Sequence, residues 1–473
     1  MVDARDASMW LDTFPGPLVP RPALDGDVQC DVAIVGGGFT GLWTAFHLTE
    51  LDPTLRITVL EREVCGFGAS GRNGGWAEGE LAGSLDKYAA ISSMDAALRQ
   101  LRAMFATVDD MQRTIAAEGI DCGFAKGGAL RLARSRPQAK RQREEIDHHR
   151  SLGLTEDEVR LLTADEARAM CAATDVVGGI HLRACAALDP ARLVRGLADV
   201  VERRGVTIHE QTTAALAATT SSTTPPHRIP CRRTGASDAV VGTVTADVVV
   251  RATEAYTRDL DGERRTLIPI YSLMIATEPL PDDVLDEIGL ADRPTFADDR
   301  YMVIYGQRTE DGRLAFGGRS VPYAFGSAIR RSLETRRRSH DDIEASLRGL
   351  FPALGDARVT HRWGGVLGAP RNWMPAVRFD RDTGFGTAGG YVGEGVAAAH
   401  LAGQTLAELV TGADTDRTTL PWVGSTSRRW EPEPLRWVGV RGSRALLGLA
   451  DRVEERTQRE ATWATRLSRL LRG

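Results

Sequence analysis

The sequence predicts an α/β fold that opens with a strand, a glycine-rich turn, a helix and a second strand. The apolar run at residues 30–35 is typical of a buried parallel strand. Glycines follow it directly, and an apolar helical pattern then covers residues 42–48. Residues 56–60 predict the second strand, so the unit takes about thirty residues. This order indicates a sheet built from parallel strands with covering helices.

Hydrophobic periodicity predicts the elements that follow. Residues 86–165 are mostly helical in pattern and charged, with a strand-like interruption at 128–132. The remaining predicted elements are an amphipathic helix at 190–204, strands at 206–210 and 244–252, and several strand-like runs within 268–319.

Composition excludes several classes of protein. The chain has 473 residues, a net charge of −5 and 42% hydrophobic residues, which fits a globular protein of two or three domains. No run of about eighteen apolar residues predicts a membrane span, and the N-terminus lacks the pattern of a signal peptide. The mild acidity gives no reason to expect nucleic acid as a partner. Six scattered cysteines without a C-x-x-C pair argue against a metal site or disulfides, so we expect a cytoplasmic protein.

The first glycine motif has the pattern of a dinucleotide-binding turn. Gly36, Gly38 and Gly41 match G-x-G-x-x-G, with Phe39 and Thr40 between them. Gly36 allows the tight turn, Gly38 lets the backbone approach a pyrophosphate, and Gly41 packs the helix on the strand. Glu61 ends the second strand, where its carboxylate can accept hydrogen bonds from a ribose diol. The alternative is a glycine-rich loop beside an unrelated surface glutamate.

A second glycine segment carries a more specific signal. Residues 65–75 read Cys-Gly-Phe-Gly-Ala-Ser-Gly-Arg-Asn-Gly-Gly, and this segment resembles the D-amino-acid-oxidase-like FAD oxidoreductases. Further matches to that family occur in order along residues 25–415, at 187–190, 251–257, 311–319, 362–365 and 389–396. The nearest branches are the gamma-glutamylputrescine and aminophosphonate oxidoreductases.

The resemblance implies a fold of the glycine-oxidase and D-amino-acid-oxidase type. A Rossmann-like FAD-binding domain is then interleaved with a substrate domain built on an antiparallel sheet. The expected division is an N-terminal arm at 1–29, an FAD-binding domain at 30–85, 165–265 and 360–415, a substrate domain at 86–164 and 266–359, and a C-terminal helical extension at 416–473.

The resemblance also implies which residues hold FAD. Besides the first motif and Glu61, these are Ser70, Gly71, Arg72, Asn73, Gly74, Ala252, Thr253, Trp363, Gly390, Gly393, Glu394, Gly395 and Val396. Arg72 could instead be an ordinary loop arginine. Some relatives attach flavin through a late cysteine or a histidine after the Gly-Ala-Ser loop. No cysteine follows Cys231 and no histidine lies within 62–76, so we expect noncovalent FAD.

The late motif can also be interpreted from its residues alone. Gly393, Glu394 and Gly395 precede a helix that begins with Val396. A glycine turn feeding a helix N-terminus presents bare N–H groups and a positive dipole. In this family that end faces the flavin, where the dipole would stabilise developing negative charge. A plain turn that only packs the helix on the sheet is the alternative.

The chemistry implied is oxidation of the C–N bond of a small-molecule amine or amino acid, giving an imine that hydrolyses to a carbonyl compound. The candidate substrate contacts are Tyr271, Tyr301, Tyr305 and Arg319. Arg319 fits an acidic substrate group, because a guanidinium can bind a carboxylate through two hydrogen bonds. His361 and His400 are candidate bases, although each could be only a packing residue.

Two further enzyme or binding roles stay open. Some oxidases of the family use a lysine to accelerate the reaction with oxygen, and no lysine follows Lys140 here. A dehydrogenase with another electron acceptor is therefore an alternative, as is a non-catalytic flavin-binding protein. A pyridine-nucleotide flavoprotein would need a second fingerprint or a redox cysteine pair, and the sequence has neither.

The C-terminal segment is basic. Residues 427–473 hold eleven arginines against six acidic residues, a local charge of +5, and a helical apolar pattern with tryptophans nearby. Such a helix can lie on an anionic membrane. We instead expect it to pack on its own domain or on a second copy in a homo-oligomer. The particular amine, the electron acceptor and the oligomeric state do not follow from the sequence.

Overall fold

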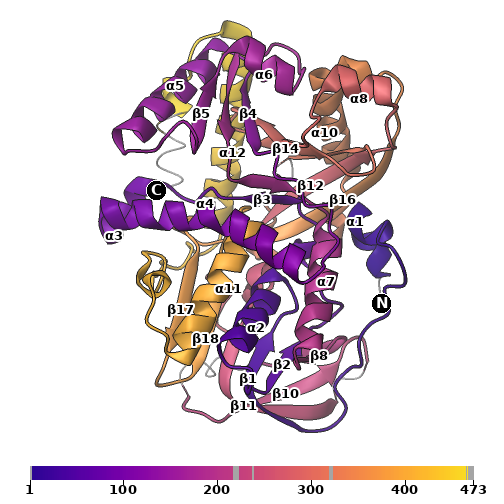
Figure 1. Cartoon of the computed structure of the whole chain (residues 1–473), viewed down its shortest axis with the longest axis vertical. Helices are drawn as coiled ribbons and strands as arrows, with labels where there is room; N and C mark the ends of the chain where they lie inside the picture. The colour runs from indigo at the N-terminus through magenta and orange to yellow at the C-terminus, as the bar shows by residue number, and fades with distance from the viewer. Residues whose placement is uncertain (1–2, 217–222, 237–238, 319–322, 465, 467–473) are drawn as a thin grey trace.

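The computed structural model describes residues 3–216, 223–236, 239–318, 323–464 and 466. Two large sheets organise the chain, and Figure 1 shows the first in the lower half and the second in the upper half. The first sheet runs in the order β17 (Ala376–Asp380), β18 (Phe385–Gly389), β11 (Val240–Arg251), β1 (Val28–Val35), β2 (Ile57–Leu60) and β8 (Thr207–His209). Strand β10 (His227–Arg233) pairs with β11 and with β9 (Thr212–Ala214).

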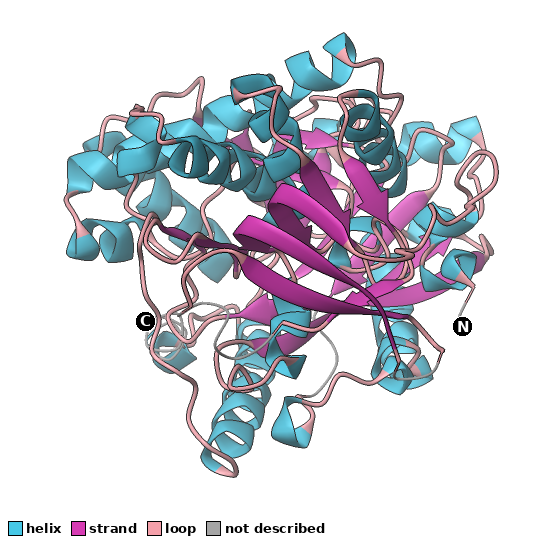
Figure 2. Ribbon diagram, turned by 90° about the horizontal axis from the view of Figure 1, so that it is seen from below, coloured by secondary structure: helices cyan, strands magenta, loops and turns pink. Residues whose placement is uncertain are grey.

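The centre of the first sheet is parallel, as the sequence predicts. Val32 of β1 is paired with Ile57 on one side and Val248 on the other, and all four residues of β2 are buried. Three helices cover this sheet: α2 (Phe39–Leu51), α7 (Pro190–Arg203) and α11 (Gly395–Thr411). Figure 2 shows helices gathered against the strands. Because the carboxyl ends of parallel strands share one edge, the glycine turn after β1 and Glu61 after β2 lie together.

The second sheet is mostly antiparallel. Its order is β16 (Val359–Ala369), β12 (Ile268–Thr277), β15 (Leu314–Gly318), β14 (Ile304–Arg308), β13 (Thr295–Asp298), β4 (Ala129–Ala133), β6 (Gly178–Leu182) and β5 (Val159–Leu162). A short ribbon of β3 (Trp76–Glu78) and β7 (Cys185–Ala187) lies beside it. The remaining helices of at least seven residues are α3 (Leu85–Ile91), α4 (Met94–Ala117), α5 (Arg136–Ser151), α6 (Ala164–Met170), α8 (Asp282–Ile288), α10 (Arg337–Leu350) and α12 (Leu435–Thr457).

Two strands from the expected FAD-binding domain pair in the sheet of the substrate domain. Strand β6 falls within 165–265, and β16 falls almost wholly within 360–415, but both pair in the second sheet. Each is held by a long antiparallel partner, β4 for β6 and β12 for β16. A division by sheets would therefore move both strands to the substrate domain, and the domain boundaries stay a proposal.

The N-terminal arm, residues 1–29, is only partly extended, although its prolines favour an extended chain. A 3-10 turn at Ala4–Ala7 and the one-turn helix α1 (Met9–Asp12) interrupt it, and Met9, Trp10 and Leu11 are buried. The four prolines that indicate an extended chain all come after α1. The expectation of a C-terminal helix that packs on its own chain is met, since Ala450 and Glu454 of α12 are buried. No helix in the described ranges is both long and apolar enough to cross a membrane.

Candidate active site

A cavity of about 360 Å³ lies where the first sheet meets the second. Its wall includes twelve of the residues expected to hold a cofactor: Gly36, Gly38, Phe39, Thr40, Glu61, Ser70, Asn73, Ala252, Thr253, Gly393, Gly395 and Val396. Seven other expected residues are not part of this wall: Gly41, Gly71, Arg72, Gly74, Trp363, Gly390 and Glu394. The two glycine segments and the late glycine turn therefore converge on one space.

The first glycine turn leaves no room for side chains. A Cβ on Gly41 would lie 2.0 Å from the carbonyl oxygen of Gly36. A Cβ on Gly36, where φ is +116°, would lie 2.5 Å from the carbonyl oxygen of Ala252. The turn thus brings the N-terminus of α2 against the end of β11, at the wall of the cavity.

Glu61 and Ser70 hold this turn in place. The Glu61 carboxylate accepts hydrogen bonds from the N–H groups of Gly37 at 2.8 Å and Glu63 at 2.9 Å. Burial raises the pKa of Glu61. The Ser70 hydroxyl accepts the N–H of Phe39 at 2.9 Å, which links the second glycine segment to the first. Each Glu61 oxygen keeps a further lone pair that a ribose hydroxyl could use.

The second glycine segment forms its own tight turn. A Cβ on Gly71 would lie 2.3 Å from the carbonyl oxygen of Gly66, a geometry like that of the first turn. Asn73 closes the loop: its amide donates to the carbonyls of Ala69 and Ser70, and its oxygen accepts the N–H of Gly75 at 2.7 Å. Asn73 therefore shapes the loop as well as lining the cavity.

Arg72 anchors the same loop from behind. Its guanidinium pairs with Glu334 at 2.9 Å and donates to the Phe67 carbonyl at 2.6 Å, while both partners of the ion pair are buried. Burial raises the pKa of Glu334 despite the attraction of Arg72. The Trp363 indole donates to the carbonyl of Arg72 at 3.0 Å. Arg72 and Trp363 thus support the loop without lining the cavity.

The late glycine turn leads into α11. Gly393 and Gly395 line the cavity, and Glu394 is the N-cap residue of the helix. Glu394 shares a hydrogen bond with Glu78 of β3, and burial with two facing carboxyls, Glu80 and Glu394, raises the pKa of Glu78 well above its usual range. The pair therefore holds a proton next to the positive end of α11.

The sequence analysis did not identify several of the residues that line the cavity. They include Arg62, Glu63, Thr212, Thr213, Glu254, Tyr256, Val366, Leu367 and Tyr391. Tyr391 donates to or accepts from the Thr40 hydroxyl at 3.0 Å, which ties the late turn to α2. Glu254 follows Thr253 directly, so its position next to a predicted cofactor residue was the available signal. The β9 residues reach the cavity through pairing with β10 and through the Thr212 N–H, which donates to the Glu61 carbonyl at 2.9 Å, and no local pattern encodes either contact.

The expected substrate residues separate into different places. Tyr305 lies against the second glycine segment: a Cβ on Gly74 would come within 2.7 Å of its ring, and its hydroxyl contacts Ser272 at 2.5 Å. Tyr271 is buried, and its hydroxyl accepts the N–H of Arg330 at 2.8 Å. Neither tyrosine is part of the described cavity wall.

Tyr301 lies at the C-terminal helix α12. The Tyr301 N–H donates to Asp451 of α12 at 2.7 Å, and its ring lies under the guanidinium of Arg141. It therefore packs the C-terminal helix rather than lining the cavity. Arg319 lies outside the described residues.

The two candidate bases lie elsewhere. His361 Nε2 is 3.1 Å from an Asp12 carboxylate oxygen at a half-buried position. His400 is buried against Trp43, with ring centroids 4.6 Å apart, and burial lowers its pKa well below the usual value. Neither histidine lines the cavity, so the structure gives no support to either as a base.

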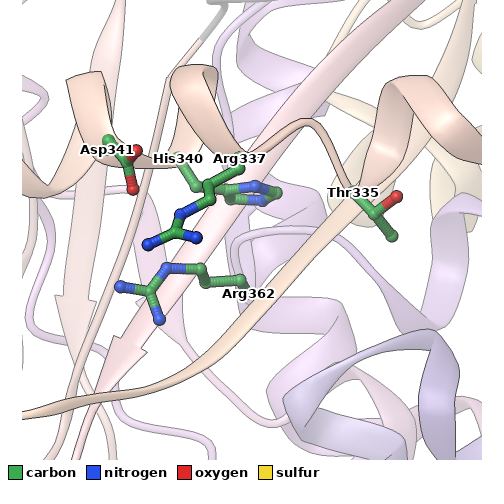
Figure 3. A pocket seen from close by; sticks show the side chains of 5 residues that line it. All are labelled: Thr335, Arg337, His340, Asp341 and Arg362. Carbon is green, nitrogen blue, oxygen red and sulfur yellow. The ribbon is translucent and has the colours of Figure 1, made fainter.

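A second depression of about 250 Å³ lies outside this site. Figure 3 shows its lining side chains, Thr335, Arg337, His340, Asp341 and Arg362, with the two guanidinium groups next to each other. His340 donates to the carbonyl of Trp363 at 2.9 Å, and burial lowers the pKa of His340. The depression shares no lining residue with the cavity described above.

The cavity fits an extended flavin dinucleotide. Glycine positions that a Cβ would fill, two helix N-termini and an acidic residue after β2 are the donor set that a diphosphate, a flavin edge and a ribose require. Together with the antiparallel second sheet, they define a flavin-dinucleotide oxidoreductase of the two-domain type.

Comparison with known proteins agrees with this class. Residues 31–409 match the family model described as "FAD dependent oxidoreductase", so the chain belongs to that family. It is 31% identical to gamma-glutamylputrescine oxidoreductase of Escherichia coli over 84% of this chain and 87% of the relative. It is 27% identical to D-amino acid dehydrogenase of Methylobacterium nodulans, over 80% and 95%. The glycine oxidase structure from Geobacillus kaustophilus superposes with a TM-score of 0.66 at 21% identity, over 82% and 96%, which confirms the predicted fold.

Proposed function

We propose that the chain oxidises the C–N bond of an amine or amino acid, using noncovalent FAD in the cofactor cavity. The observation that carries this proposal is the convergence of both glycine segments and the start of α11 on one cavity. When bound there, FAD supplies a two-electron acceptor for the hydride of the substrate α C–H bond. The resulting imine takes up water and yields a carbonyl compound and a released amine or ammonia.

The residues of the chain have distinct roles in this reaction. The N-terminus of α2 binds the pyrophosphate, and Glu61 binds the ribose. The N-terminus of α11 stabilises negative charge where the flavin is reduced. Glu78, hydrogen-bonded to Glu394, stays protonated and so adds no negative charge next to this helix end. Tyr305 and Ser272, whose hydroxyls are 2.5 Å apart, form one side of the substrate position.

The side chains that line the cavity support noncovalent binding of FAD. The described lining residues include neither a cysteine nor a histidine, which are the side chains that relatives use for attachment. The six described cysteines are unpaired and buried, which supports a reducing, cytoplasmic location.

The second candidate function is the same oxidation carried out by a dehydrogenase, with an electron acceptor other than oxygen. No lysine lines the described cavity. The three lysines of the chain are engaged elsewhere, Lys87 with the Asn372 carbonyl, Lys126 with Asp109 and Lys140 with Glu460. The lysine that accelerates the oxygen reaction in some relatives therefore has no counterpart here. We expect reduced enzyme to react slowly with oxygen.

Anaerobic reduction of the purified holoprotein tests the proposal. Amines, amino acids, polyamines and aminophosphonates are added in turn while flavin absorbance is followed, and the carbonyl product is trapped. Bleaching together with a carbonyl product supports C–N oxidation, and readmitted air then separates an oxidase from a dehydrogenase. Holoprotein that stays oxidised with every compound would favour a non-catalytic flavin-binding protein.

A further inference from the structure

Glu254 occupies an unusual backbone position at the cofactor cavity. It directly follows Thr253 at the end of β11 and has a φ of +42°, which side chains other than glycine rarely adopt. Non-glycine residues in this conformation concentrate at functional sites, because the surrounding structure must hold them there. The side chain lies in the cavity wall between Thr253 and Tyr256.

The Glu254 carboxylate joins the two sheets. One oxygen accepts the N–H of Gly368 on β16 at 3.1 Å, and the other accepts the N–H of Gly390 after β18 at 3.1 Å. β16 belongs to the second sheet and β18 to the first. A Cβ on Gly389 would lie 3.2 Å from the same carboxylate, so a side chain there would crowd the contact.

The carboxylate has no cationic partner among the described ion pairs. Arg251, three residues earlier, pairs with Glu263 at 2.7 Å, and Arg258 on the same short helix pairs with Asp259. From the late glycine turn, the Tyr391 hydroxyl is the titratable group that faces Glu254. Two backbone N–H groups therefore stabilise this half-buried carboxylate.

We propose that Glu254 is a positioning residue that fixes the spacing between β16 and the glycine turn before α11, and thereby the shape of the flavin end of the cofactor site. This inference rests on the proposed function, because it takes the cavity to hold FAD. Gly390 lies three residues before Gly393, which lines the cavity at the start of α11. Loss of the contact would let the turn and the helix N-terminus move relative to β16.

The positioning role of Glu254 is coupled to the protonation of its carboxylate. Burial raises the pKa of Glu254 to about 7, so a large fraction of the free protein carries it ionised near neutral pH. FAD in the cavity removes water from the carboxylate and raises that pKa further. Binding of FAD therefore takes up a proton, and FAD affinity must fall as the pH rises above about 7.

The test compares wild type, Glu254→Gln and Glu254→Ala, with Glu263→Gln as the matched control. Glu263 lies nearby and is not part of the cavity wall. Apoprotein of each is titrated with FAD by flavin fluorescence at pH 6 to 9, and thermal unfolding of the apoprotein is recorded at each pH. The amide of glutamine keeps one acceptor but turns a donor toward the other glycine N–H.

We expect Glu254→Gln to bind FAD about tenfold more weakly at pH 6 and to lose the pH dependence that wild type shows. Glu254→Ala should do the same, and Glu263→Gln should keep both the affinity and its pH profile. A Glu254→Gln protein with wild-type affinity and pH profile would overturn the inference, even if its apoprotein were less stable. Wild type that binds no FAD would instead overturn the proposed function.

Discussion

The buried ion pair between Arg72 and Glu334 gives a sharp test of how the cofactor loop is held. Arg72→Met keeps the length and apolar volume of the side chain but removes its charge. Glu334 would then remain in a buried position, where the exposure of its side chain is 10%, without its 2.9 Å partner. Breaking such a pair on one side costs about 3–5 kcal/mol of unfolding free energy.

This cost should depend on pH in a definite direction. The folded-state pKa of Glu334 is raised above its unfolded value, so its contribution to stability is present at low pH and is lost as the pH rises. Without Arg72 the folded-state pKa rises further, because the guanidinium is the main group that lowers it. Arg72→Met should therefore lose least at about pH 5 and most at about pH 8.

Urea unfolding at the two pH values measures this effect. Arg72→Met/Glu334→Leu, which removes both charges, should recover most of the loss, because no unpaired carboxylate remains. Arg102→Met is the surface control, since its pair with Glu158 at 3.5 Å is exposed and worth less than about 1 kcal/mol. A loss below about 1 kcal/mol for Arg72→Met, equal at both pH values, would refute the reasoning.

Three further predictions concern the cavity and its neighbours. Gly41→Ala should raise the dissociation constant for FAD about ten- to a hundredfold, because its Cβ would lie 2.0 Å from a backbone oxygen; Gly349→Ala is the control. Fluorescence titration would contradict this if both variants bound alike. Tyr305→Phe should lower kcat/KM about tenfold through the lost Ser272 contact, whereas Tyr301→Phe should not; equal effects would count against the proposed substrate position. His361→Asn should leave turnover unchanged, and a large drop would restore His361 as a base.

The local parts of the site followed from the sequence. The glycine turn after β1, the acidic residue after β2 and the glycine turn before α11 each depend on neighbours within a few residues. Strand pairing then brings them to one edge of the sheet. Gly36, Glu61 and Gly393 could therefore be named before the structure, because short-range backbone requirements determine where they occur.

The sequence analysis missed or misplaced residues whose positions depend on contacts between distant parts of the chain. Tyr301 was expected near the substrate, but its partner Asp451 lies 150 residues later in the chain. Glu254 bridges two sheets through backbone N–H groups, which leave no side-chain pattern to read. Trp10 in the N-terminal arm donates to the carbonyl of Asn73 at 2.9 Å, a contact that composition alone could not indicate.

FAD binding by the purified chain tests the central claim most directly. Apoprotein is titrated with FAD, the bound flavin is counted against protein, and the complex is then denatured in acid. The structure predicts one FAD per chain, all of it released into the supernatant on denaturation. Flavin that stays with the denatured protein would contradict noncovalent binding, and the absence of any bound flavin would contradict the assignment of the cavity.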